Sequence, residues 1–342
     1  MAPRQSAHRQ GGGLVMTAPD ARARIRKAAD KVLSSQPIRE LSWRLLPGDV
    51  RVLTYHDVPD AERFARHVDV IASESTPVSL SEFLDAVRGG GCLPSRATLI
   101  TFDDGDVSVR HHATPMLAQR GLPSVCFVIA GLVDSHDAFW WLEVRDHLEH
   151  GVPPPTDYPP SPDGVIARLK LVPDPERRRV ISWLRERRGE QTRQENLTSS
   201  DLLAMEGSGM SIESHSMTHP CLDQCTASTV ETEVVDSRAR LSEMLGRPVR
   251  AFAYPNGNHD HRVRSAARAA GYAAGFAFDH AVARLSQPPF EFSRLRVGAY
   301  ASTERLSAVL SGSHPTVHRL RSALPRIEPR GARHRRPGER LT

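Results

Sequence analysis

The sequence has few cysteines and lacks long apolar segments. Its four cysteines, Cys92, Cys126, Cys221 and Cys225, are too few for a disulfide scaffold in a chain of 342 residues. No apolar run approaches the roughly 20 residues that a membrane-spanning helix needs. The basic N-terminal stretch lacks the apolar core of about 7 to 15 residues that secretion signals contain. These absences predict a cytoplasmic protein with reduced thiols and no integral membrane segment.

Lysine is also scarce, so arginine carries nearly all of the positive charge behind the net charge of +5. Much of that charge lies in residues 313–342, which are rich in arginine, histidine and proline. This composition predicts a basic, disordered tail. No aromatic residue is interleaved with its arginines, so nucleic-acid binding is not expected. Peripheral contact of the tail with an anionic membrane stays open, and the oligomeric state is not indicated.

Short, mostly unbroken apolar runs recur along the middle of the chain and are typical of strands buried on both faces. Helical patterns lie between many of them, as in residues 60–73 and 226–248. Alternating strands and helices indicate a parallel sheet. No nucleotide-binding glycine pattern follows the first run, which favours a barrel over a doubly wound sheet. The seven runs are residues 50–57, 97–105, 123–131, 209–216, 250–257, 273–279 and 293–300.

The pattern predicts three parts: an N-terminal leader and helix (1–48), a barrel (49–312) and the tail (313–342). Residues 134–208 break the alternation with an aromatic helix, a proline-rich stretch and a charged helix. We predict a helical insertion between two barrel strands, packed near the active face, since such long excursions are usually lids or linkers. Its Trp140 and Trp141 either form a sugar-stacking platform or anchor the insertion to the core.

Two acidic residues, Asp103 and Asp104, follow the apolar run at 97–102 directly. Buried carboxylates cost free energy unless something satisfies them. Gly105 lets the backbone turn sharply, so both side chains can reach the space above the carboxyl end of the strand, where barrel enzymes keep their active sites. The alternative is a simple turn in which the first aspartate caps the next helix.

A pair of histidines, His215 and His219, follows another strand-like run. On a helical turn, positions four apart share one face and can bind one metal ion. Two histidines and a carboxylate, with a fourth position open, are the ligands of a catalytic zinc. No glutamate follows His215, so this is not the metalloprotease motif HExxH. Asp104 is available as the carboxylate.

Two further features stand near these residues. The turn at 254–257 follows a strand, and a backbone N–H near Asn256 could stabilise an oxyanion. Cys221 and Cys225 suggest an alternative hypothesis, in which cysteine and histidine side chains together bind a structural zinc ion. That hypothesis leaves the aspartates unexplained, and Pro220 interrupts a continuous ligand helix, so we expect buried free thiols instead.

The chain resembles the polysaccharide deacetylase family, also called the NodB-homology domain or carbohydrate esterase family four. "TFDDG" matches the family's first motif, "SHSMTH" its second and "AYPNG" its third, while "VLTYHDV" is similar to the first strand of many members. The resemblance implies a distorted (β/α)₇ barrel and a divalent metal, usually zinc or cobalt. It implies Asp103 as the base and Asp104, His215 and His219 as metal ligands.

The chain departs from the family's third motif, which often begins with an arginine that pairs with the catalytic aspartate. Ala253 stands at that position, so another residue must orient Asp103. We predict Arg296, on the last strand, with Arg294 as the alternative.

A late histidine motif that supplies the family's general acid has no clean copy. His314 is our candidate, with His56 and His280 as the other options. Asp106 either shapes substrate entry or caps the helix that begins near Ser108.

The resemblance implies a metal-dependent hydrolase that removes the N-acetyl group from an amino sugar in a glycan, glycolipid or glycan precursor. Two alternatives remain. The chain could act on another acyl group or another non-peptide C–N bond, or it could be a non-catalytic carbohydrate-binding member of the family. A nucleic-acid binder acting through the basic tail is a third class, with steep salt dependence as its signature.

Overall fold

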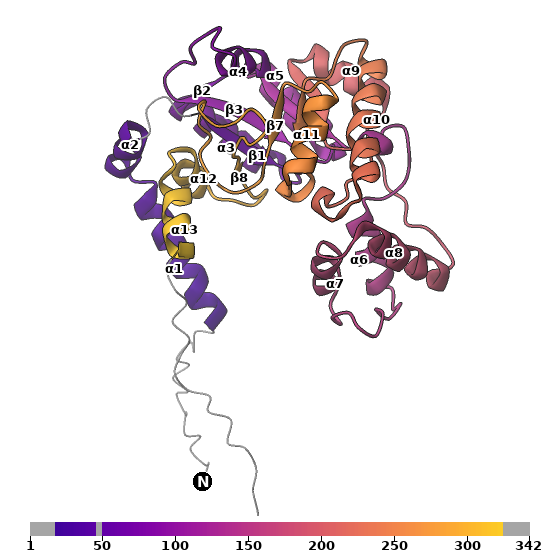
Figure 1. Ribbon diagram of the computed structural model, residues 1–342. Coiled ribbons are helices and arrows are strands. Elements are labelled where there is room, and N and C mark those ends of the chain that lie inside the picture. Colours follow the sequence, from indigo (N-terminus) through magenta and orange to yellow (C-terminus); the bar gives the residue numbers. More distant parts are fainter. Residues whose placement is uncertain (1–17, 46–49, 324–342) are drawn as a thin grey trace, which may run out of the picture.

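The structure, a computed structural model, describes residues 18–45 and 50–323 (Figure 1). Its centre is a parallel sheet in the order β7-β6-β5-β4-β3-β1-β8, and a short β2 (Thr76–Pro77) pairs with β3. The other strands are β1 (Arg51–Tyr55), β3 (Ala97–Phe102), β4 (Ser124–Val128), β5 (Met210–Ser214), β6 (Ala251–Ala253), β7 (Ala274–Phe276) and β8 (Leu295–Arg296). Each of the seven predicted runs contains one of these seven strands.

The sheet closes through the segment that leads into β8. Phe292 forms a parallel bridge with Phe276 at the end of β7. Three residues later, Leu295 of β8 pairs with Leu53 of β1. One stretch of chain thus joins both edges of the sheet, so the predicted distorted (β/α)₇ barrel is confirmed.

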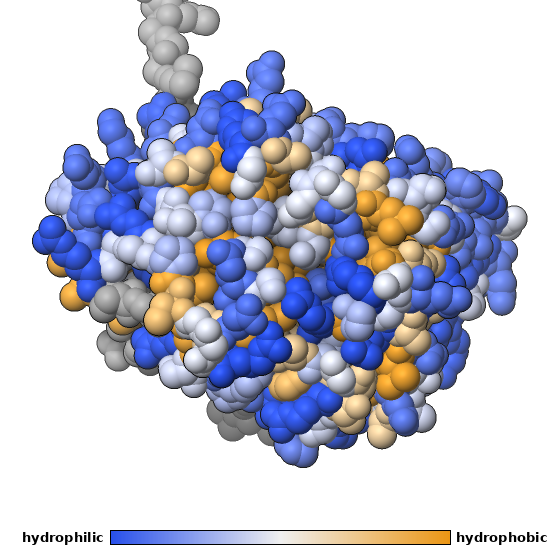
Figure 2. Space-filling view, turned by 90° about the horizontal axis from the view of Figure 1, so that it is seen from above, coloured by the Kyte–Doolittle hydropathy of each residue, from blue (hydrophilic) through white to orange (hydrophobic). Residues whose placement is uncertain are grey.

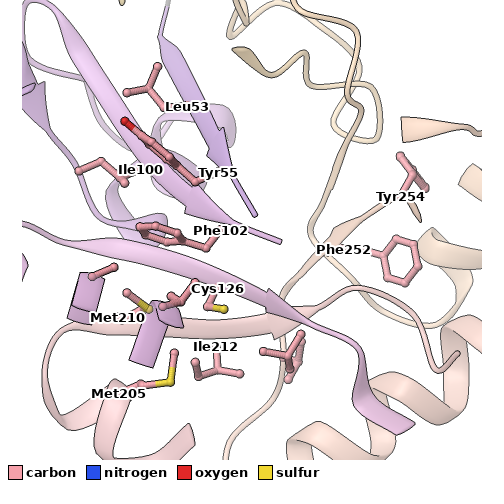
Figure 3. Close-up of a cluster of buried hydrophobic side chains, with 14 of the residues drawn as sticks. Leu53, Tyr55, Ile100, Phe102, Cys126, Met205, Met210, Ile212, Phe252 and Tyr254 are labelled. Carbon is pink, nitrogen blue, oxygen red and sulfur yellow. The ribbon is translucent and has the colours of Figure 1, made fainter. Parts of the chain in front are cut away.

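Alternate residues of the strands pack into two apolar layers. One layer gathers inward-pointing side chains such as Val52, Leu99 and Phe127. The other packs against the surrounding helices and includes Tyr55 and Phe102, whose stacked rings lie 5.6 Å apart (Figure 3). Alternate residues of a strand point to the same side, and Asp103 comes four residues after the inward-pointing Leu99. Its side chain therefore points toward the barrel interior rather than toward the helices.

The helices around the barrel are amphipathic segments whose ends are fixed by capping residues. Asp60 caps the helix at 61–74, where its side chain accepts a hydrogen bond from the Arg63 N–H. The helix at 227–245 ends at Gly246, in the left-handed conformation (φ 64°) that favours glycine. These helices are α3 (Ala61–Glu74), α4 (Leu80–Val87), α5 (Thr114–Gln119), α9 (Ser199–Gly207), α10 (Ala227–Leu245), α11 (His261–Ala269) and α12 (Thr303–Leu310).

The insertion is a separate helical lobe, drawn at the lower right of Figure 1. It contains α6 (Trp140–Glu149), α7 (Pro162–Leu169) and α8 (Asp174–Arg188), which share their own apolar cluster. The predicted range of 134–208 also includes α9, but Leu202 and Met205 of α9 pack into the main core. The lobe therefore ends before α9, which is a regular barrel helix.

The termini flank the barrel as helices α1 (Ala18–Leu33), α2 (Gln36–Leu45) and α13 (Ser313–Ala323). The first part of the predicted tail is thus helical, while the rest of the tail and the first residues of the leader lie outside the described residues. The hydroxyl of Ser313 donates to the carbonyl of Leu33, which joins α13 to α1. None of the helices in the described ranges is long and apolar enough to cross a membrane.

Candidate metal centre

The candidate site lies where strands β1, β3 and β5 end. Asp103 follows β3, and its N–H donates to the Tyr55 carbonyl at the end of β1. Asp104 and Gly105 both have positive φ angles, 69° and 84°, so the chain turns sharply after the strand. Aspartate tolerates this conformation better than most residues. The turn lets two consecutive carboxylates serve one site.

The predicted metal ligands come together. Asp104 Oδ1 lies 3.3 Å from His215 Nε2 and 3.4 Å from His219 Nε2. One ligand atom from each of the three residues lies within 4.8 Å of the others. Within the described residues, this is the one cluster of three or more histidine, cysteine or carboxylate side chains with metal-binding spacing.

The local bonding fits a divalent cation. Asp104 Oδ1 is buried and has no hydrogen-bond partner in the structure, a costly state that a bound cation would relieve. His215 Nδ1 lies 2.8 Å from the Ala253 carbonyl, so this nitrogen donates and Nε2 keeps its lone pair. The donor set of two imidazoles and one carboxylate is that of a catalytic zinc site.

The second acid, Asp103, is held by a buried arginine. Arg294 Nη1 and Nη2 lie 2.7 and 2.8 Å from the two oxygens of Asp103, a bidentate pair. Arg294 is fully buried, and its Nε donates to the Ala277 carbonyl. Asp103 Oδ2 is also 3.8 Å from His215 Nε2, so the carboxylate faces the metal ligands.

The prediction that Arg296 orients Asp103 is therefore wrong, and its alternative Arg294 takes that place. The Arg296 guanidinium donates instead to the Phe278 carbonyl. The two arginines lie two residues apart, which in an extended segment is about 6.6 Å of rise. Arg294 reaches the interior, whereas Arg296 emerges at the exposed rim.

Both acids ionise readily despite their burial. Burial raises the pKa of Asp103, but Arg294 and then His215 outweigh it and hold the pKa below its usual range. Burial likewise opposes ionisation of Asp104, and His215 and His219 outweigh it. Burial lowers the pKa of His219 to about 3. At neutral pH the site thus offers two carboxylates and an unprotonated His219.

The insertion contacts His219, one of the candidate metal ligands, directly. Trp140 Nε1 donates to the His219 carbonyl at 3.0 Å, so Trp140 anchors the lobe to the barrel. The Trp141 ring lies 4.6 Å from the His219 ring and stacks on Phe139. A cavity of about 410 Å³ opens beside them, with Arg177 in its lining. The sequence does not reveal this cavity, because it forms only where the lobe meets the barrel.

The predicted acid His314 lies in another cluster. Its Nδ1 is 2.9 Å from His280 Nε2, and both rings are near His318. The three line a cavity between α1, α12 and α13. Of the two other options, His280 lies in this same cluster, and His56 lies near the two acids. It follows β1, whose Tyr55 pairs with Phe102, and it acts electrostatically on both carboxylates.

The remaining candidates have structural partners. The Asn256 amide donates to Cys221 Sγ, and the Asp106 carboxylate accepts from the Ser108 N–H, the capping role. Burial raises the pKa of Cys221 to about 11 and that of Cys225 to about 12. Both cysteines are buried free thiols, as expected.

Comparison with known proteins agrees with this geometry. The family model described as polysaccharide deacetylase matches residues 90–275, more than half of the chain. The chain belongs to the polysaccharide deacetylase family. A curated relative, the putative polysaccharide deacetylase YxkH of Bacillus subtilis, is 27% identical over 115 residues. That match spans 34% of this chain and only 41% of the relative.

Solved structures share the fold at low identity. The deacetylase PplD of Streptococcus pyogenes, in complex with acetate, has a TM-score of 0.56 at 19% identity, over 78% of this chain and 99% of that chain. IcaB from Ammonifex degensii has a TM-score of 0.54 at 21% identity, over 77% and 97%. These likenesses establish the barrel.

The geometry predicts that the chain binds Zn²⁺ through Asp104, His215 and His219. Replacing one ligand, as in His215→Gln, should weaken zinc affinity by about a hundredfold or more, since even loss of an outer partner typically costs 10- to 100-fold. Isothermal titration of metal-free protein measures this. His314→Gln is the matched control and should bind zinc as the unchanged protein does. Equal affinity in all three would refute the ligand assignment.

Proposed function

We propose that this protein is a zinc-dependent hydrolase that removes the N-acetyl group from an amino sugar in a glycan, glycolipid or glycan precursor. The observation that carries the proposal is the convergence of an arginine-paired aspartate and a three-residue metal cluster in one buried site. Membership in the polysaccharide deacetylase family supports the substrate class. Other acyl groups and binding without turnover are the alternatives tested below.

Asp103 is the proposed base. Its pKa is low enough for full ionisation at neutral pH, and Arg294 fixes both oxygens. Oδ2 is 3.8 Å from His215 Nε2, which places the carboxylate beside the metal ligands without making it one of the three. Asp104, His215 and His219 would hold a divalent cation, which would supply Lewis acidity at the scissile carbonyl. Asp103 takes the proton of the attacking water.

The turn after β6 is the proposed donor to the developing oxyanion. Within this turn, the N–H groups of Gly257 and Asn258 donate to the carbonyls of Tyr254 and Pro255. Ala253, at the start of the turn, holds His215 through its carbonyl. We assign the Asn256 N–H to the oxyanion, because the turn is fixed next to a metal ligand and needs no reorganisation.

His56 is the proposed acid that protonates the leaving amine. It sits beside Asp103 through the pairing of β1 with β3, and its ring lies 5.2 Å from the Phe278 ring. It is partly exposed, so it can exchange protons with solvent. This assignment replaces His314, which the structure groups with His280.

The base is tested by acetate release from N-acetylglucosamine oligomers with added Zn²⁺. Asp103→Asn should lower kcat by about 10²- to 10⁴-fold, the usual contribution of a positioned base, while zinc binding persists. Asp106→Asn, on the same loop, is the matched control and should retain activity, because an asparagine can still cap the turn.

The same assay separates the alternatives. If the protein hydrolyses a sugar with a different acyl group but no acetyl sugar, the alternative of a deacylase acting on another acyl group is favoured. Saturable binding of the oligomers without turnover would favour a carbohydrate-binding protein. Unchanged turnover after complete chelation would end the metal-dependent proposal.

Arg294 should set the acid limb of the pH profile. Only ionised Asp103 accepts a proton, and Arg294 keeps its pKa low, so activity persists as the pH falls. Arg294→Lys loses the bidentate pair, which raises the pKa of Asp103 and moves the acid limb of kcat/KM to higher pH. Arg296→Lys should leave the limb in place. The measurement is kcat/KM against pH for each variant. An acid limb at the same pH in Arg294→Lys and the unchanged protein would contradict this role.

His56 should matter only when the leaving group needs a proton. His56→Gln should lower kcat for the acetamide by about 10²-fold. An aryl acetate, whose leaving group departs without protonation, should be hydrolysed at nearly the unchanged rate. His314→Gln serves as the control on both substrates. Equal losses on both would show that His56 is not the acid.

A further inference from the structure

Exposed hydrophobic side chains gather at the terminal helices. The described residues include ten large hydrophobic side chains that are exposed, and six of them lie on α1, α2 and α13 or in the loop before α12. The face seen in Figure 2 instead shows hydrophobic residues in separate patches between hydrophilic ones. The six are Ile25, Val32, Leu41, Leu45, Tyr300 and Leu320.

Helix α1 carries an apolar edge flanked by cations. Ile25 and Val32 are seven residues apart, share one face and are 65% and 58% exposed. Arg26, next to Ile25, and Lys31, next to Val32, are exposed about 100° around the helix from that face. The acid Asp30 is buried on the opposite side, paired with an arginine of α12. The outward surface of α1 therefore combines apolar and positive groups.

Helix α13 extends this surface. The Ser313 hydroxyl donates to the Leu33 carbonyl, so the C-terminal end of α1 meets the N-terminal end of α13, and both helices extend away from the barrel (Figure 1). Leu320 on α13 is 63% exposed. The sequence that follows, residues 324–342, contains six arginines and two glutamates, which adds positive charge to the same end of the chain.

The cavity between α1, α12 and α13 has the same mixed chemistry. It measures about 700 Å³, and Ile25, Val309 and Val317 contribute apolar lining. Arg26 stands at the same cavity, as does Arg305, which is paired there with Asp30. An apolar space with cations at its margin suits the acyl region and phosphate of a lipid better than it suits a folded protein surface.

We propose that α1 and α13 form a docking surface for an anionic lipid bilayer. Ile25, Val32 and Leu320 enter the boundary between head groups and acyl chains, and the neighbouring lysines and arginines pair with lipid phosphates. An exposed apolar edge with a basic flank is the pattern of helices that lie in the membrane interface. Each basic residue near an anionic surface adds attraction that salt screens. The proposal does not depend on the enzymatic activity.

Vesicle flotation of the full chain tests this docking surface. Binding to vesicles with about one third phosphatidylglycerol should exceed binding to pure phosphatidylcholine by about tenfold or more, and about 0.5 M salt should weaken it. The double variant Ile25→Glu/Val32→Glu should lose about tenfold or more of that binding. Arg26→Glu/Lys31→Glu should lose the preference for anionic vesicles over neutral ones.

Matched controls make each outcome decisive. Leu203→Glu/Val235→Glu, at exposed apolar positions of α9 and α10, should bind vesicles as the unchanged chain does. Circular dichroism and retained zinc binding show that each variant is folded. No preference for anionic vesicles would overturn the proposal. So would binding that survives the α1 variants and disappears only on deletion of 324–342, or a dimer by light scattering that Ile25→Glu/Val32→Glu dissociates.

Discussion

The buried pair of Arg294 and Asp103 is the interaction on which the site depends. Removing one partner of such a pair typically costs about 3 to 5 kcal/mol, because the other charge stays buried without compensation. Here the arginine comes from the segment that closes the barrel, and the aspartate from a central strand. The pair therefore joins the last part of the fold to the centre of the site and keeps Asp103 ionised.

The metal cluster depends on backbone geometry as much as on side-chain type. Asp104 and His219 both adopt left-handed backbone conformations, with φ of 69° and 58°. Two N–H groups of the loop between the histidines, those of Met217 and Thr218, donate to the buried carboxylate of Glu233 on α10. Such local strain persists only where surrounding contacts fix it. The barrel supplies those contacts, and the ligands converge as a result.

Much of the fold and the metal cluster followed from sequence, because each signal was local. Apolar runs marked the strands, and the acidic pair and histidine spacing marked Asp103, Asp104, His215 and His219. The errors concern long-range geometry. Arg294 and Arg296 share one short segment, and only the barrel's closure decides which reaches Asp103. The surroundings of His314 also depend on long-range packing, since α13 contacts α1 and the His314 ring contacts His280.

The segment that closes the barrel also determines when, during folding, the site acquires its arginine. Arg294 lies more than 190 positions after Asp103, so Asp103 gains its partner only once nearly the whole barrel has been assembled. An emerging chain that has completed β3 but not β8 has an acid without its guanidinium, and its sheet has an open edge. The Asp103 carboxylate is thus paired with Arg294 only in a chain whose barrel has closed.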